Sequence, residues 1–395
     1  MTFELGINYW PRHSAMYMWR ELDIAEVRDD MARIAALGFD VVRVFTMARD
    51  FLPEPLTVAA DMVVRLVEVA REAKDAGLKV VPTLVVVNMS GHIWWPVWML
   101  DPYGRPGDLY SDPTILRSQV LLAETCVRAL SGDDAIRAWD LANEIDDAQQ
   151  PETRDAAWLW ASSLASAIRR NAPSAAVRIG SHLPSLTTNN NMRVDDLARA
   201  VDEDVMHAYP LYCDLARSFL DPELVPFACA LTAALAGRGR GAIMQEFGLC
   251  TAPPGEAGHT IEDDFLGQPR CQYLASEDEA AAYYETVLDG LLRTGAAGAY
   301  AWCYGDYDRR LFDRAPFRTA VRERTFGLVR ADGSEKPAAE VFRKFRNRLS
   351  AHSRDTSGAA ATIPPVLDVS ADEYYREPGT SFERLYAAWL AGVHS

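Results

Sequence analysis

Eight short apolar segments, each followed by a segment with helical periodicity, constrain the fold of this chain more than any other feature of its sequence. The apolar segments are the predicted strands, and they cover residues 3–9, 41–45, 79–87, 136–142, 177–181, 205–207, 242–247 and 297–303. Apolar strands that alternate with amphipathic helices are typical of a parallel α/β sheet with helical crossovers. Eight such units predict a closed (β/α)8 barrel, the TIM barrel. An open doubly wound sheet would need a glycine-rich turn after its first strand, where this chain has Asn-Tyr-Trp-Pro.

Local signals mark where several of the helices begin. Asp112 and Asp221 each precede a proline, which is typical of a capping residue followed by the first helical position. Ser276 and Glu279 have the spacing of a capping box. We therefore expect helices to begin at these three places, and a weaker helix over residues 192–201.

The chain divides into a long and a short part. Residues 1–349 form the predicted catalytic barrel, and residues 350–365 are small, polar and end in proline, as linkers do. Residues 366–395 carry a short helical stripe, but about thirty residues are too few to build a separate core. We expect this C-terminal extension to pack on the barrel.

Composition excludes several classes of protein. The chain has 56 acidic and 40 basic residues, a net charge of −16, which disfavours a nucleic-acid partner. No run of about 18 apolar residues is present to cross a membrane. Six scattered cysteines without a C-x-x-C motif indicate free thiols. The first residues lack the pattern of a signal peptide, so we expect a cytoplasmic protein of open oligomeric state.

Two glutamates stand at strand ends that a barrel brings together. Glu144 follows the fourth predicted strand directly, and Glu246 ends the seventh. Side chains at the carboxyl ends of barrel strands share one mouth. A single such glutamate is as well explained by a structural carboxylate bonded to backbone amides, but two facing carboxylates are what glycoside hydrolysis requires.

The pair and its surroundings resemble a known family. Asn143-Glu144 after the fourth strand, with Glu246 at the end of the seventh, resembles the clan A retaining glycosidases, and the chain is most similar to glycoside hydrolase family 5. The resemblance extends over residues 3–348 and includes the opening segment 6–10 and the stretch 327–338. It implies a TIM barrel that works without a cofactor.

The resemblance also implies roles for individual residues. Glu144 matches the acid/base, Glu246 the nucleophile, and Asn143 the residue that hydrogen-bonds the sugar 2-hydroxyl. Arg43 matches the arginine that keeps the nucleophile ionised, although a structural salt bridge inside the barrel is the alternative. The remaining matched residues are the strand-six pair His207 and Tyr209 and the aromatic floor Trp302, which core packing would also explain.

Further candidates lie in the loops. Trp10 follows the first strand, and His92 is loosely matched to a histidine after the third. The loop 88–111 contains Trp95 and two other tryptophans, at least one of which we expect to face sugar. The loop 251–275 is either a lid or rim, or a variable surface loop. Asp306 is expected to pair with a nearby arginine.

The predicted function is a retaining β-glycosidase that hydrolyses terminal β-mannosyl residues of small oligosaccharides. The segments NYWP and HAYP and the final tail are similar to exo-acting β-mannosidases of the family. An endo-β-mannanase, a β-glucosidase and a catalytically silent carbohydrate-binding barrel remain as alternatives. No metal is expected, since the sequence lacks H-E-x-x-H and similar ligand spacings. No G-x-S-x-G motif points to a serine hydrolase.

Overall fold

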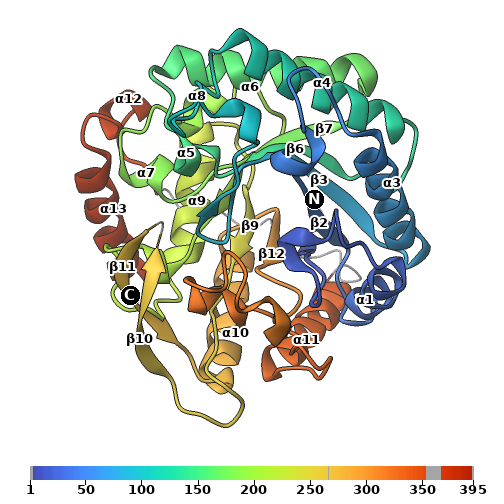
Figure 1. The fold of residues 1–395 in the computed structure, drawn as a ribbon. Helices are drawn as coiled ribbons and strands as arrows, with labels where there is room; N and C mark the ends of the chain where they lie inside the picture. The colour runs from blue at the N-terminus through green and yellow to red at the C-terminus, as the bar shows by residue number, and fades with distance from the viewer. Residues whose placement is uncertain (1–2, 266, 353–365, 394–395) are drawn as a thin grey trace.

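The computed structural model describes residues 3–265, 267–352 and 366–393, and its centre is one sheet of eight parallel strands. The spatial order of the strands is β7-β6-β3-β2-β1-β12-β9-β8, and a bridge between His182 and His207 joins the two end strands into a barrel (Figure 1). The strands are β1 (Glu4–Asn8), β2 (Val41–Met47), β3 (Lys79–Val86), β6 (Ala138–Asn143), β7 (Ala176–Gly180), β8 (Val205–His207), β9 (Ile243–Phe247) and β12 (Gly298–Ala301). The predicted (β/α)8 barrel is confirmed.

Helices surround the barrel on its outside, as Figure 1 shows. The long ones are α1 (Ile24–Ala36), α3 (Ala60–Asp75), α4 (Pro113–Ala129), α6 (Arg154–Asn171), α9 (Leu224–Ala236), α10 (Glu277–Arg293) and α11 (Pro337–His352). The crossover between β7 and β8 differs, because it contains only the four-residue helices α7 (Pro184–Thr187) and α8 (Val194–Leu197). The helix expected over residues 192–201 is therefore much shorter than predicted.

Two of the three predicted helix starts have the expected caps. The Asp112 carboxylate accepts hydrogen bonds from two backbone amides of α4, and Ser276 and Glu279 form a reciprocal capping box on α10. The prediction for Asp221 is wrong. Helix α9 begins at Leu224 with Glu223 as the capping residue and no side-chain cap, while the Asp221 carboxylate accepts from the Glu223 amide at 3.3 Å, the Arg217 guanidinium and the Tyr386 hydroxyl.

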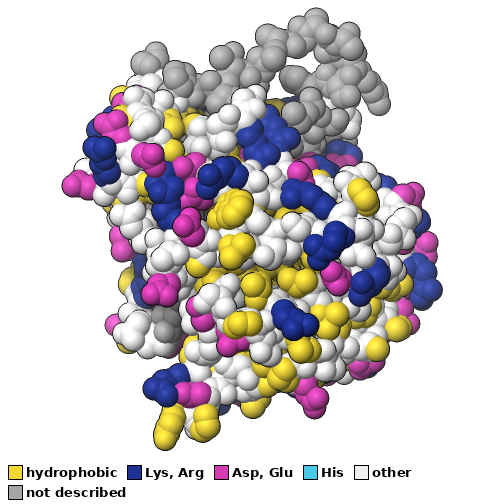
Figure 2. Space-filling view, turned by 90° about the horizontal axis from the view of Figure 1, so that it is seen from above, with side chains coloured by type: hydrophobic (Ala, Val, Ile, Leu, Met, Phe, Trp, Pro, Cys, Tyr) yellow, Lys and Arg dark blue, Asp and Glu magenta, His cyan; other side chains and the backbone are white. Residues whose placement is uncertain are grey.

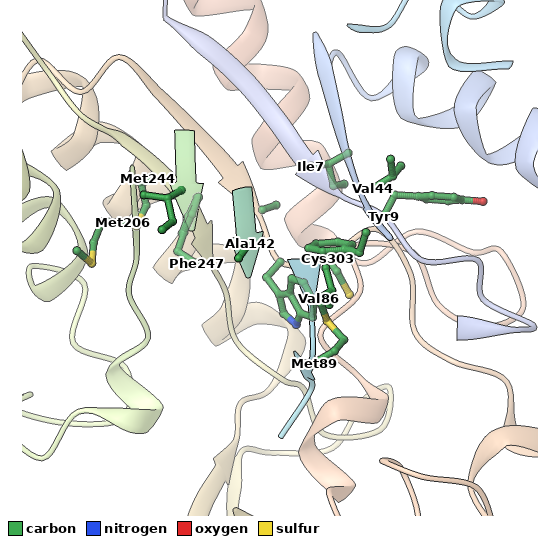
Figure 3. Packing of buried hydrophobic residues seen from close by; sticks show 14 of the residues in the cluster. Ile7, Tyr9, Val44, Val86, Met89, Ala142, Met206, Met244, Phe247 and Cys303 are labelled. Atoms are coloured by element: carbon green, nitrogen blue, oxygen red, sulfur yellow. The ribbon is translucent and has the colours of Figure 1, made fainter. Parts of the chain in front are cut away.

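The apolar faces of strands and helices form the main core. Figure 3 shows buried residues of this core on several strands, among them Ile7, Val44, Val86 and Met244. The barrel interior also holds polar side chains. Arg178 is fully buried there and donates to the Tyr300 hydroxyl at 3.1 Å.

Two segments lie outside the barrel units. The loop after β9 forms a hairpin of β10 (His259–Phe265) and β11 (Gln268–Leu274). The C-terminal segment contains α12 (Ala371–Tyr374) and α13 (Pro378–Val393), which lies beside α7 and α9 (Figure 1). Because α11 runs to His352, the expected linker starts later than residue 350, and residues 353–365 lie outside the described part of the chain.

The surface is mixed in charge. On the face shown in Figure 2, basic and acidic side chains lie among one another, with apolar side chains between them. All six cysteines are free, as expected. Among the helices of the described ranges, none is both long and apolar enough to cross a membrane.

Candidate active site

A pocket of about 260 Å³ opens at the carboxyl ends of the barrel strands. It is lined by side chains from most of the loops that follow the strands, and both predicted catalytic glutamates are among them. The lining residues are Asn88, Met89, Ser90, Gly91, Asn143, Glu144, Asp147, His182, Leu183, Pro184, His207, Tyr209, Tyr212, Glu246, Arg270, Trp302, Arg322, Glu323 and Phe326.

Glu144 projects into the pocket from a strained turn. It stands between β6 and the short helix α5 (Ile145–Ala148), with a left-handed backbone at φ 40° and ψ 49°. Non-glycine residues are held in this region only where the surroundings determine it, often at functional sites. A hydrogen bond of 3.0 Å from the Glu144 amide to the Gly180 carbonyl fixes the turn.

Glu246 lies deeper, with a side chain that is 5% exposed. The Arg43 guanidinium donates to its Oε1, and the Tyr209 hydroxyl donates to its Oε2 at 2.9 Å. Burial raises the pKa of Glu246, while the positive charge of Arg43 and the Tyr209 hydrogen bond act in the opposite direction. Arg43 and Tyr209 thus favour the ionised form of this carboxylate.

Arg43 is fully buried beneath the pocket and serves more than one carboxylate. Its Nη2 donates to Asp140 at 2.7 Å and to the Asn143 amide oxygen at 2.9 Å. Its Nη1 donates to the Asn8 side chain at 3.1 Å as well as to Glu246. The structural salt bridge and the contact to the predicted nucleophile, which were alternatives for Arg43, are therefore both present.

His207 connects the two glutamates. Its Nδ1 lies 2.8 Å from Glu144 Oε1 and 3.5 Å from Glu246 Oε1, and a carboxylate oxygen of each glutamate lies within 4.8 Å of the other. Burial lowers the pKa of His207 to about 3, so its ring is neutral. The Gln245 amide nitrogen faces His207 Nε2 at 3.4 Å, which assigns the ring proton to Nδ1. His207 then donates to Glu144 Oε1, and a proton on Glu144 resides on Oε2.

The pocket brings together most residues predicted from the sequence. Asn143, Glu144, His207, Tyr209, Glu246 and Trp302 line it, and Arg43 lies directly below. Trp302 is 4% exposed and is followed by a cis peptide bond.

Three predicted site residues are not brought to the pocket. Trp10 is fully buried and stacks on Phe45 with ring centroids 5.2 Å apart, because the apolar core beside β2 accommodates the ring. His92 packs edge-on against Trp94, and Trp95 is half-buried outside the pocket lining.

The tryptophans of the loop after β3 anchor the loop. The Trp94 indole donates to the Met89 carbonyl at 3.2 Å, and the Trp98 indole donates to the Leu52 carbonyl at 2.8 Å. Neither these two nor Trp95 is among the residues that line the pocket. The pocket lining therefore does not support a sugar-facing tryptophan in this loop, and the indole groups of Trp94 and Trp98 are used to hold the loop on the barrel.

Asp306 also differs from the expectation. Its carboxylate accepts from Lys336 Nζ at 2.8 Å, so its ion pair is formed with a buried lysine from the approach to α11 rather than with a nearby arginine.

One group of pocket residues that sequence reasoning missed surrounds Glu144. Asn88 follows β3 and donates to the Asp147 carboxylate at 3.1 Å. His182 follows β7, and its Nδ1 lies 4.0 Å from Glu144 Oε1. Both stand where barrel strands end, so the rule that singled out Glu144 could have found them.

The second missed group forms the opposite wall and is centred on the turn η5 (Val321–Arg324). Arg322 Nε donates to the Tyr212 hydroxyl at 3.0 Å, and that hydroxyl donates to Glu323 at 3.0 Å. The Asp263 carboxylate of β10 accepts from the Val321 amide at 2.7 Å and the Arg322 amide at 2.9 Å. The hairpin is thereby attached to the pocket wall, as a rim. No local sequence signal marks these residues, because they meet only in the folded chain.

Among the residues that the structure describes, two groups of three side chains offer donor atoms within 4.8 Å of one another, as a metal site would. They are Glu144, Asp147 and His182, and Glu144, His207 and Glu246. The second group lies against the Arg43 guanidinium, whose positive charge opposes a cation there. That the chemistry needs no metal stays a prediction.

The fold and site define a TIM-barrel protein with two facing glutamates at its mouth, and solved structures share this fold. A GH5_18 protein from Streptomyces cattleya, in complex with GlcNAc, aligns with a TM-score of 0.80 at 22% identity over 98% of this chain and 91% of that chain. An exo-β-1,4-mannosidase from Opitutaceae bacterium strain TAV5 aligns with a TM-score of 0.74 at 26% identity, over 89% of this chain and 60% of that chain. An endo-β-1,4-mannanase from Thermotoga petrophila aligns with a TM-score of 0.61 at 17% identity, over 89% of this chain and 78% of that chain.

The GH5_18 neighbour confirms that the fold resembles that of glycoside hydrolase family 5, as the sequence predicts. No protein-family model and no curated protein matches the chain.

Proposed function

We propose that this protein is a retaining β-glycosidase that releases terminal β-mannosyl residues from short oligosaccharides. The observation that carries the proposal is the close approach of a partly buried carboxylate, Glu144, and a buried one, Glu246, with an oxygen of each within 4.8 Å of the other, in two different environments. Glu246 is held by a cation and a hydroxyl, while Glu144 accepts from a neutral histidine. Inverting glycosidases separate their carboxyl groups by about 6.5–9.5 Å to admit a water, so the closer spacing favours a retaining mechanism.

The proposed first step forms a glycosyl-enzyme. An ionised Glu246 attacks the anomeric carbon, the glycosidic carbon–oxygen bond breaks, and Glu144 gives its Oε2 proton to the leaving oxygen. Burial raises the pKa of Glu144, which favours a carboxyl group that holds this proton until the bond breaks.

The proposed second step releases the sugar. The Glu144 carboxylate takes a proton from water, the water oxygen attacks the anomeric carbon, and the bond to Glu246 breaks. Both glutamates return to their starting states, so neither a cofactor nor a metal is needed to balance the reaction.

Exo action is supported by the closed side of the pocket. A methyl group on Gly91 would lie 2.7 Å from the Arg322 guanidinium, so the loop after β3 touches η5 across the mouth. The β10–β11 hairpin is attached to the same wall through Asp263. A pocket that ends at a wall admits the terminal sugar of a chain, whereas an endo-acting enzyme needs a groove that is open at both ends.

The neighbours favour mannose at that position. The exo-β-1,4-mannosidase is one of them. Another is a variant GH5_18 protein from Streptomyces cattleya, solved in complex with Manβ1-4GlcNAc, which aligns with this chain at a TM-score of 0.78. The endo-mannanase neighbour keeps an endo-acting alternative, against which the closed wall argues.

A panel of 4-nitrophenyl β-glycosides tests the proposal. We expect turnover of the mannoside well above that of the glucoside, galactoside and xyloside, with NMR showing the β-anomer as the first product. Glu246→Ala should abolish turnover but retain sugar binding, and Glu285→Ala on the exposed face of α10 is the control.

Each alternative has its own outcome. Preferred turnover of the glucoside would replace the substrate and keep the mechanism, whereas an α-anomer as first product would contradict retention. Sugar binding by the wild type without turnover of any glycoside would identify a silent binding barrel.

A further inference from the structure

A second histidine faces Glu144 and is held differently from His207. His182 lies two residues beyond the end of β7, with a side chain that is 8% exposed and forms part of the pocket wall. Its Nε2 lies 2.8 Å from Asp146 Oδ2, and its Nδ1 lies 4.0 Å from Glu144 Oε1. Both ring nitrogens are thus directed at carboxylates.

Asp146 anchors this ring. Its carboxylate is buried in α5 and also accepts from the Asn190 side chain at 2.7 Å. Burial acts to raise the pKa of Asp146, but His182 and the hydrogen bonds hold it below the usual value. Burial likewise acts to lower the pKa of His182, yet Asp146, Asp147 and Glu144 raise it well above the usual value. The pair is therefore an imidazolium on a carboxylate at neutral pH.

We propose that His182 is a positioning residue for Glu144: a cation, fixed by Asp146, that orients the acid/base carboxyl and controls how readily it gives up its proton. The inference rests on the proposed function, because it assigns a role within the same site. His207 is neutral and donates to Glu144 Oε1 at 2.8 Å, so it orients this carboxyl without adding charge. His182 adds the charge.

The other charged groups around Glu144 make this cation important. Asp146 and Asp147 face it from α5, Glu246 from β9, and Arg43 from β2. The Arg43 charge is shared with Asp140 and Glu246, which leaves Glu144 facing carboxylates on the α5 side. His182 Nε2 also lies 3.8 Å from Asp147, so the imidazolium offsets that side directly.

Two neutral replacements test the role of the charge. His182→Gln can place its side-chain amide where the histidine Nε2 meets Asp146, and His182→Asn can place its amide near the position of Nδ1. Neither replacement carries the positive charge of the imidazolium. Without the imidazolium, Glu144 should hold its proton more tightly, and the alkaline limb of kcat/KM should move up by about one pH unit. His13→Asn is the matched control, because His13 also pairs with a carboxylate, Glu26 at 2.7 Å, but outside the pocket lining.

Leaving groups separate positioning from simple structural support. For β-1,4-mannobiose, whose leaving oxygen needs the proton, we expect kcat/KM of both variants to fall about 10- to 100-fold, within the usual contribution of general acid catalysis. For a 2,4-dinitrophenyl β-mannoside, which leaves without protonation, the fall should stay below about threefold. Equal losses on both substrates with an unmoved alkaline limb would overturn the proposal, because a wall residue that only packs would affect both alike.

The charge state of His182 can be measured without turnover. Nitrogen-15 spectra of histidine-labelled wild-type protein, with the His182 signals identified by their loss in His182→Gln, should show an imidazolium up to pH 8. A neutral ring at pH 7 would overturn the inference even if the protein hydrolyses mannosides. A wild type that turns over no β-glycoside would instead reject the proposed function, and the two failures are therefore distinguishable.

Discussion

We expect that removing the Tyr209 hydroxyl lowers activity strongly. This hydroxyl donates to Glu246 Oε2 at 2.9 Å, and hydrogen bonds to charged groups contribute about 1.5–3 kcal/mol. Tyr209→Phe keeps the ring against Phe326 but removes this bond, so kcat/KM should fall about 10- to 100-fold with little change in Tm. Tyr103→Phe, at an exposed position, is the control and should change neither kcat/KM nor Tm. Unchanged steady-state kinetics for Tyr209→Phe would show that the Tyr209 hydroxyl has no role in the reaction.

The two glutamates also predict a pH profile. Burial raises the pKa of both Glu144 and Glu246 above the ordinary glutamate value of about 4.3. Activity requires Glu246 ionised and Glu144 protonated, so kcat/KM should rise with pH through the first pKa and fall through the second, with both limbs above about pH 4.3.

A variant assigns the limbs. Glu144→Gln should lose the alkaline limb on an activated aryl mannoside, because the glutamine amide does not titrate and this substrate leaves without protonation. Maximal activity below pH 4, or an alkaline limb that survives in this variant, would contradict the assignment.

Single residues were predictable where the barrel itself determines their position. Glu144 and Glu246 were found because strand ends converge, and His182 and Asn88 follow the same rule, whereas Arg43, inside β2, was found only through the family resemblance. Trp10 also stands after a strand, yet its large apolar ring is buried against Phe45. Strand position alone therefore does not tell a pocket residue from a core residue.

At the scale of elements, β7 approaches its neighbours so closely that it needs glycine. A Cβ on Gly180 would lie 2.7 Å from the Ala142 carbonyl and 3.0 Å from the His207 ring. Gly180→Ala must push back the strand or the histidine that contacts Glu144, and overpacking typically costs about 1–3 kcal/mol. We expect a lower Tm and at least a roughly tenfold loss of kcat/KM. Gly392→Ala in α13, where an added Cβ would meet no atom outside its own helix within 4 Å, is the control and should be neutral.

The β10–β11 hairpin and η5 form one wall through Asp263. Asp263→Ala leaves the buried Arg322 cation without this carboxylate, and breaking a buried ion pair typically costs about 3–5 kcal/mol. Because the wall stands opposite Glu144, we expect KM for β-1,4-mannobiose to rise more than kcat falls. Glu262→Ala, at the exposed neighbouring position, is the control. A fall in kcat at constant KM would show that the wall does not bind substrate.

The strands were predictable as elements, but several connections were not. A continuous run of β-branched, apolar residues such as 79–87 strongly favours a buried strand over a helix or a loop. The observed β3 accordingly ends within one residue of the predicted strand. The hairpin arises from pairing between Thr260 and Tyr273, thirteen residues apart, which local periodicity does not reveal. Asp221 does not cap α9, which begins three residues later, and its carboxylate also binds a distant tyrosine, Tyr386, that local sequence does not reveal.

For the whole molecule, the C-terminal segment occupies a place in the ring of helices that the chain leaves sparse. The crossover between β7 and β8 has only short helices, and α13 covers it, with Phe382 packing on Phe227 of α9 at 5.0 Å (Figure 1). The Tyr374 hydroxyl donates to the Leu186 carbonyl at 2.6 Å, and the Tyr375 hydroxyl donates to the Ser185 carbonyl at 3.0 Å. The segment is therefore bonded to α7, which continues into the pocket wall.

These two bonds predict that the C-terminal segment supports activity from a distance. The double variant Tyr374→Phe/Tyr375→Phe leaves two buried carbonyls without these donors, which should lower the free energy of unfolding by about 1–3 kcal/mol. Because Leu183 and Pro184 line the pocket beside His182, kcat/KM should fall as well. Ending the chain after residue 352 should have a larger effect of the same kind, since it also exposes the Phe227 surface.

Urea unfolding followed by tryptophan fluorescence measures the first effect, and turnover of β-1,4-mannobiose measures the second. Arg384→Ala is the control, because it removes an exposed ion pair with Asp368 from the same segment without touching α7. If the double variant were as stable and as active as this control, the C-terminal segment would be an appendage. If the double variant loses both stability and activity and the control loses neither, the C-terminal segment supports the barrel and its activity.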